Sequence, residues 1–113
     1  MNKAEMRPIF SLKSSLDNMK MNIEKLYARE AGILKAMAHP TRLFILNAIK
    51  KKEVCVCELT EMVGDDISTV SKHLLVLKNA GLVTSRREGN WLFYSLKCPC
   101  VLDFSACIAG LKG

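Results

Sequence analysis

Residues 54–79 read VCVCELTEMVGDDISTVSKHLLVLKN and carry the clearest structural pattern in the chain. They predict a short helix over Val54–Val63, a turn at Gly64-Asp65-Asp66 and a second helix over Ile67–Asn79. The apolar residues of the second helix recur at helical spacing and are expected to face the core: Ile67, Val70, Leu74 and Leu77. Two helices joined by a glycine-containing turn form a helix-turn-helix, whose second helix enters the major groove of DNA. The pattern therefore predicts a DNA-binding element.

The segments on either side of this element complete a small domain. Downstream, Leu82–Arg86 and Trp91–Leu96 are strand-like, and residues 87–90 have the composition of a hairpin turn. Further helices are expected over Asn18–Ala38, from Thr41 to the lysines at 50–52, and over Pro99–Leu111. The predicted fold is mainly α (α+β), a winged helix-turn-helix with a two-stranded wing. We expect it to span residues 18–113, after a flexible N-terminal arm over residues 1–17.

The outward face of the second helix is the predicted DNA contact. It presents small hydroxyl groups and a positive charge from these residues: Ser68, Thr69, Ser71, Lys72 and, at its edge, His73. Hydroxyl groups allow close approach to bases or phosphates, and the lysine supplies charge to the DNA backbone. Arg86 and Arg87 at the hairpin tip are expected to contact phosphates or the adjacent minor groove. Each of these residues also has a simpler interpretation as a solvent-facing side chain, and His73 as a surface or capping residue.

Composition supports a nucleic-acid partner and reduced cysteines. The net charge is +6, from 17 basic and 11 acidic residues, which suits a polyanion. Five cysteines occur without an export signal, so thiols for metal or redox chemistry are favoured over a disulfide scaffold. No apolar run approaches a membrane-spanning length. We therefore expect one cytoplasmic domain that completes its core by dimerising.

Three segments carry a family resemblance. Ala36–Leu46 reads AMAHPTRLFIL, Ser68–Val83 contains STVSKHL and LKNAGLV, and Gly89–Leu96 reads GNWLFYSL. In this order and spacing they resemble the ArsR family of metal-sensing repressors, over about residues 30–97. The resemblance implies a homodimeric repressor whose first and last helices form the dimer interface. It also implies double-stranded operator DNA of two-fold symmetry as the partner.

Cys55-Val56-Cys57 is the predicted ligand site. It resembles the cysteine-containing helix of the arsenite-responsive members, which implies trivalent arsenic or antimony as the inducer. Thiols at positions i and i+2 lie on opposite sides of a regular helix, so a ligand that grips both holds the helix start partly unwound. A helix N-terminus also favours the thiolate form that binds soft ions. The third cysteine of the best-known pattern is absent, because its position is Thr60 here.

The C-terminal cysteines are the candidates for a third thiolate. Cys98, Cys100 and Cys107 are expected either to form a soft-metal site of their own or to complete the Cys55/Cys57 pair, across the dimer in one version. A purely structural role is the alternative. Cadmium, lead or zinc would use the same thiolates. The family's zinc site of Asp and His residues on the last helix is not supported, because Asp103 is the only ionisable candidate there.

Three other functions compete with a metalloid-released repressor. The first is a repressor that senses oxidants or reactive sulfur through a disulfide between the Cys55/Cys57 region and the C-terminal cysteines. The second is a small thiol enzyme, which the missing Cys-x-x-Cys and the helix-turn-helix disfavour. The third is a constitutive DNA-binding protein with inert cysteines.

Overall fold

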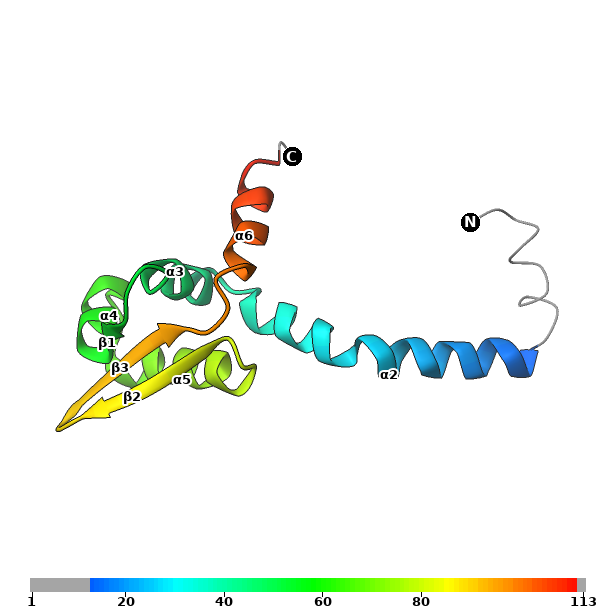
Figure 1. Cartoon of the computed structure of the whole chain (residues 1–113), viewed down its shortest axis with the longest axis horizontal. Helices are drawn as coiled ribbons and strands as arrows, with labels where there is room; N and C mark the ends of the chain where they lie inside the picture. Colours follow the sequence, from blue (N-terminus) through cyan, green and yellow to red (C-terminus); the bar gives the residue numbers. More distant parts are fainter. Residues whose placement is uncertain (1–12, 112–113) are drawn as a thin grey trace. The chain divides into compact units, whose positions relative to one another are not determined.

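The computed structural model describes the backbone of residues 13–111 and the side chains of residues 22–111. In chain order its elements are α2 (Lys13–Met37), α3 (Pro40–Ala48), β1 (Val54–Cys55), α4 (Val56–Val63), α5 (Ile67–Asn79), β2 (Val83–Glu88), β3 (Trp91–Leu96) and α6 (Val101–Ala109) (Figure 1). The chain divides into two units, residues 1–32 and 33–113. None of the helices in the described part has the length and hydropathy to cross a membrane.

The described part of the first unit consists of α2 as far as Gly32. This helix begins at Lys13, five residues before its predicted start, so residues 13–17 of the predicted arm are helical. Residues 1–12 of that arm lie outside the described residues. The apolar side chains of this segment are exposed: Ile23, Leu26 and Tyr27. The helix therefore presents apolar surface that its own unit leaves open.

The core of the second unit lies between α3, α4 and α5. Helix α3 begins after His39, whose Nδ1 accepts a hydrogen bond from the Thr41 N–H at 3.1 Å, and Pro40 occupies the first helical position. The side chains at the centre of the core are almost completely buried: Ile45, Leu46, Ile49, Leu59, Val70, Leu74 and Leu77. Burying such side chains is the main source of folding free energy. The predicted helix-turn-helix is confirmed, with α5 at its predicted bounds.

Two predicted features of the helix-turn-helix are wrong. Ile67, expected in the core, is 54% exposed, because it is the first residue of α5 and lies beyond the core that begins at Val70. Val54 and Cys55 are not helical. They form β1, which pairs antiparallel with β3 through Val54–Tyr94 and Cys55–Phe93. Because the main chain of Cys55 pairs with β3, α4 begins only at Val56.

The wing is a hairpin of β2 and β3, and the sheet order is β1-β3-β2. Residues 87 and 88, expected in the turn, belong to β2, because Glu88 pairs with Trp91. The turn itself is only Gly89-Asn90. Gly89 has φ +61°, as the first central residue of a type II′ turn requires. Because the turn takes up only two residues, both strands extend to the tip of the hairpin.

Helix α6 follows the wing after a turn. It is shorter than the predicted 99–111, because Pro99 and Cys100 form the turn that precedes it. Leu102 anchors α6 in the core. An open apolar groove of about 380 Å³ runs beside the helix, and these residues line it: Leu34, Met37, Ala38, Leu43, Phe104, Ser105, Ile108 and Ala109.

Candidate functional site

The start of α5 is held by its N-cap. The Asp66 carboxylate accepts hydrogen bonds from the Thr69 N–H and the Ser68 hydroxyl, both at 2.7 Å. These hydrogen bonds, first that from Ser68 and then those from Thr69, lower the pKa of Asp66. The cap satisfies a helix N–H that would otherwise lack a partner. It therefore fixes the first turn of the helix predicted to enter DNA.

The outward face of α5 carries three of the five residues that the sequence predicts there as exposed side chains. Ser68, Ser71 and Lys72 are exposed, and Thr69 is half-buried. Sequence reasoning missed Leu75, which is 56% exposed. It lies three and four residues after Lys72 and Ser71, so it shares their face. An apolar side chain there suits a thymine methyl group. The sequence could have indicated this position of Leu75, because the residue follows Ser68, Ser71 and Lys72 at helical spacing.

His73 is engaged inside the protein. Its half-buried ring lies with its centroid 4.5 Å from that of His39, and its Nδ1 lies 3.2 Å from Nη1 of Arg42. Burial lowers the pKa of His73, and the neighbouring His39 and Arg42 lower it further against a smaller opposing effect of Asp65. The ring therefore joins α5 to α3, which accounts for His73 without a DNA contact.

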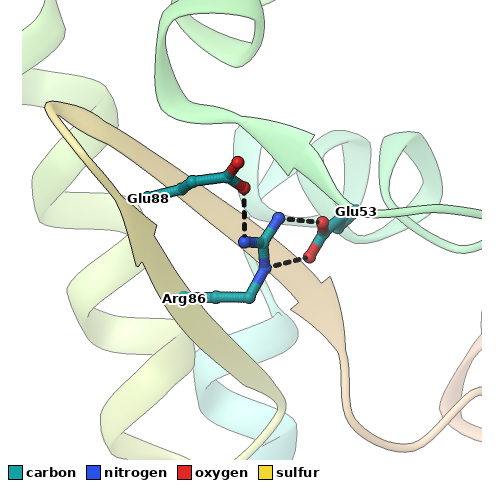
Figure 2. Close-up of polar contacts among 3 residues, drawn as sticks. All are labelled: Glu53, Arg86 and Glu88. Atoms are coloured by element: carbon teal, nitrogen blue, oxygen red, sulfur yellow. Dashed lines mark hydrogen bonds and ion pairs between the residues drawn. The ribbon is translucent and has the colours of Figure 1, made fainter.

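Arg86, predicted at the hairpin tip, lies within β2 and is occupied by two carboxylates (Figure 2). Its guanidinium contacts both oxygens of Glu53, at 2.5 and 3.3 Å, and Glu88 at 2.6 Å. Hydrogen bonding to Glu53 and then Glu88 raises the pKa of Arg86, and Arg86 in turn lowers that of Glu53. Its side chain also stacks over Phe93, 4.9 Å from the ring centroid. The expected position of Arg86 at the hairpin tip is therefore wrong, while its contact with DNA stays a prediction.

Of the two arginines in the wing, Arg87 is the better placed for the predicted contact with DNA. It lies one residue nearer the turn, is exposed, and forms no ion pair within the part of the chain that the structure describes. At the other end of the wing, Lys78 of α5 donates to the Ser85 hydroxyl at 2.7 Å. This hydrogen bond connects the end of α5 to β2.

Cys55 and Cys57 lie on either side of a change in backbone structure. Cys55 is the last residue of β1 and the N-cap of α4, with extended φ −69° and ψ 145°, and Cys57 is in the first turn of α4. The chain at Cys55 is therefore extended and not helical, and unwinding of the helix start by a ligand that binds both thiols stays a prediction. Cys55 is half-buried and Cys57 exposed. Both thiols lie at the junction between the sheet and α4, and α4 packs on α5.

The two thiols differ in acidity. Partial burial, the largest single effect, raises the pKa of Cys55, but the backbone N–H and thiol of Cys57 and the N–H groups of Glu58 and Leu92 outweigh it, so the net shift is downward. The pKa of Cys57 is raised, chiefly by its hydrogen bond with Cys55. Cys55 is thus the preferred thiolate, which is the form that binds soft metals and attacks oxidants.

The C-terminal cysteines lie in a different place. The Sγ atoms of Cys98 and Cys100 are 2.9 Å apart in the turn before α6, while Cys107 is exposed on α6. Among the described residues, no three His, Cys, Asp or Glu side chains gather closely enough to hold a metal ion. Within one chain, then, neither the predicted C-terminal trio nor a completed Cys55/Cys57 site is brought together.

Comparisons with known proteins agree with this geometry. The family model described as "Bacterial regulatory protein, arsR family" matches residues 39–85. MJ1325 of Methanocaldococcus jannaschii, an HTH-type transcriptional regulator by name, is 42% identical over 69 residues, which is 60% of this chain and 78% of that protein. ArsR2 of Halobacterium salinarum carries the name of an arsenical resistance operon repressor. It is 44% identical over 69 residues, 59% of this chain and 58% of that protein.

A solved structure supports the same fold. The solution structure of Mb0332 from Mycobacterium bovis is that of a homodimeric winged helix-turn-helix DNA-binding domain. It superposes with a TM-score of 0.66 and 32% identity, over 75% of this chain and 79% of that one.

Proposed function

Since this chain belongs to the arsR family of bacterial regulatory proteins, we propose that it is a homodimeric repressor released from its operator by a thiophilic metalloid at Cys55 and Cys57. Family membership makes the protein a DNA-binding transcriptional regulator and not an enzyme. One observation carries the proposal. The two thiols lie where β1, hydrogen-bonded to the wing strand β3, becomes the helix that packs on α5.

Release follows from the position of the pair. A ligand that bonds to both sulfurs sets their separation, and the backbone of Cys55 and Cys57 must follow. Cys55 is paired with Phe93 of β3, and the nearby Glu53 holds Arg86 of β2. Movement at Cys55 is therefore transmitted to the wing through the sheet and to α5 through α4. DNA affinity requires both elements at once, so a small displacement lowers it.

Trivalent arsenic or antimony is the proposed inducer. The thiolate preference of Cys55 suits a soft ion, and the name of the similar ArsR2 points to arsenicals. A third thiolate comes from a C-terminal cysteine of the second copy, because one chain gathers no third ligand among its described residues. Cadmium, lead and zinc are weaker inducers at the same thiolates.

The dimer is the second element of the proposal. Apolar residues of α2 are exposed, and so are the large side chains of α6: Phe104 and Ile108. A second copy would cover both, as expected for first and last helices that form the interface, and the similar Mb0332 domain is homodimeric. Two copies place two recognition helices about 34 Å apart, in successive major grooves of operator DNA. The protein acts in the cytoplasm, where its cysteines stay reduced.

Operator release on arsenite addition tests the function. A fluorescent duplex selected in vitro for binding reports affinity by anisotropy, with the protein kept reduced by a phosphine instead of a dithiol. Wild-type protein binds the duplex and releases it when arsenite is added. Cys55→Ser and Cys57→Ser bind the duplex equally well but need about tenfold more arsenite for release. This corresponds to a loss of about 1.4 kcal/mol in the free energy of arsenite binding.

Cys98→Ser, Cys100→Ser and Cys107→Ser then identify the third ligand, because only the variant that lacks it should also need more arsenite for release. Weak DNA binding by both Cys55→Ser and Cys57→Ser would mean that the thiols serve packing. Unchanged release in these variants would remove the pair from the inducer site.

A further inference from the structure

The turn between the wing and α6 holds a second pair of thiols. The Val101 N–H donates to the Cys98 carbonyl at 3.3 Å, which closes a four-residue turn with Pro99 and Cys100 at its centre. Proline is favoured at the second position of such a turn, because its fixed φ matches the position and no N–H is required of it. Cys100 has φ −63° and ψ −21°, close to the turn's third position. The sequence Cys-Pro-Cys therefore builds this turn locally.

The turn changes the geometry of an i, i+2 cysteine pair. On a regular helix the two sulfurs would lie on opposite sides. Here the Cys98 and Cys100 Sγ atoms are 2.9 Å apart, within about 1 Å of the length of an S–S bond. Cys100 is exposed and Cys98 half-buried, so small molecules reach the pair.

The pair lacks what a metalloid site needs. Trivalent arsenic prefers three thiolates, and no third ligand joins Cys98 and Cys100 among the described residues. Two sulfurs in near contact without a third ligand favour bond formation between them over metal capture. The hydrogen bond with Cys98 raises the pKa of Cys100, so Cys100 keeps its proton until it reacts.

We propose that Cys98 and Cys100 form a redox site, closing to an intrachain disulfide on reaction with a hydroperoxide, separately from the Cys55/Cys57 pair. The Cys98 thiol gives up its proton and its sulfur attacks the terminal oxygen of the hydroperoxide: the S–O bond of a sulfenic acid forms, the O–O bond breaks, and the departing oxygen takes up a proton and leaves as an alcohol or water. The Cys100 sulfur then attacks this sulfenic acid, the S–S bond forms, the S–O bond breaks and water leaves with the Cys100 proton. Two thiols lose two electrons in total, and the peroxide gains them.

A disulfide in so short a ring is readily reduced again, which suits a reversible signal. The turn joins β3 of the wing to α6, and Leu102 in the first turn of α6 is buried in the core. Drawing the sulfurs together shifts the start of α6 relative to the wing. If α6 forms the dimer interface, as the proposed function holds, the spacing of the two recognition helices changes and operator affinity falls.

The test uses full-length protein carrying Cys55→Ser and Cys57→Ser, so that the first thiol site cannot contribute. After hydrogen peroxide treatment and blocking of free thiols, the tryptic peptide of residues 98–112 is analysed by mass spectrometry. We expect it to lose two hydrogens, with Cys98 and Cys100 bonded and Cys107 blocked. Adding Cys98→Ser or Cys100→Ser abolishes the loss, and adding Cys107→Ser leaves it unchanged. Pairing with Cys107, a bond between chains, or no loss at all would overturn the proposal.

Operator anisotropy on the same samples tests the consequence. Oxidised protein is expected to bind about fivefold or more weakly, with recovery on reduction. Disulfide formation with unchanged affinity would overturn the regulatory role alone. Failure of the reduced protein to bind any operator would instead count against the proposed function, while the mass measurement still decides the chemistry.

Discussion

At the residue scale, the role of each predicted site residue depends on the side chains around it. Lys72 is exposed on α5, whereas Arg86 is held between Glu53 and Glu88. Cys57 has its partner thiol beside it, but the position three residues later is Thr60, whose hydroxyl donates to the Val56 carbonyl at 2.7 Å. Each difference leads to a measurable consequence.

Restoring the absent thiol should sharpen the response to arsenite. Residues 57 and 60 lie on one face of α4, because they are three apart in a helix. Thr60→Cys is therefore expected to supply the third thiolate from the same helix, in place of the one proposed from the second copy, and to lower the arsenite concentration for operator release by about tenfold or more. Thr60→Ser, which keeps the hydroxyl, is the control and should match wild type. An unchanged response in Thr60→Cys would show that Cys57 does not contribute a ligand.

The salt dependence of operator binding should separate the cations. Lys72→Ala and Arg87→Ala are each expected to reduce the slope of log affinity against log salt by about 1, the loss of one phosphate contact. Arg86→Gln is the matched control in the wing, because two carboxylates already compensate its charge. An equal reduction in Arg86→Gln would mean that Arg86 leaves Glu53 when DNA binds.

At the element scale, α5 is fixed at its start by Asp66, along its length by the core and at its middle by His73. The His73 contact joins α5 to α3 through Arg42. Protonation of the His73 ring would place a positive charge beside the guanidinium of Arg42. Protonation of His73 is therefore expected to weaken the contact between α5 and α3.

Stability should fall on mild acidification because of His73. Its pKa is lowered in the folded protein, so the unfolded chain binds the proton more tightly. The contribution of neutral His73 to the free energy of unfolding is complete above its pKa in the unfolded chain, about 6.5. It declines as the pH falls below that value toward the lower pKa of His73 in the folded protein. The urea midpoint of wild type should drop more than that of His73→Gln between about pH 7.5 and about pH 5. Equal drops would assign the loss to other groups, since His39 is present in both proteins.

At the scale of the whole molecule, the chain leaves apolar surface that one copy does not cover. Leu26 is 66% exposed in the first unit, and the apolar groove beside α6 is open in the second. Large exposed apolar surfaces mark interaction sites, and a second copy is the proposed occupant of both.

A charge on α2 should therefore separate the subunits. Leu26→Glu is expected to sediment as a monomer at micromolar concentration and to lose most of its operator affinity, because the two half-sites are no longer bound together. Glu24→Gln, an exposed polar change on the same helix, is the control and should remain dimeric. A dimeric Leu26→Glu protein would move the interface away from this part of α2.

Local patterns in the chain were enough to locate the recognition helix and the strands of the wing. The helical spacing of Val70, Leu74 and Leu77 reports the core face of α5 directly. Gly89-Asn90 likewise marks the hairpin, because a type II′ turn needs a residue that tolerates positive φ. These features depend on neighbours a few residues apart, so composition and spacing predict them.

Contacts between distant segments were decided only in the folded molecule. Cys55 became a strand residue because Phe93, far along the chain, pairs with it, and Arg86 met Glu53 because that pairing places β1 beside the wing. The separation of the C-terminal thiols from the Cys55/Cys57 pair has the same origin. Spacing along a sequence specifies local backbone, but which side chains meet depends on how whole elements pack, and that is a property of the complete fold.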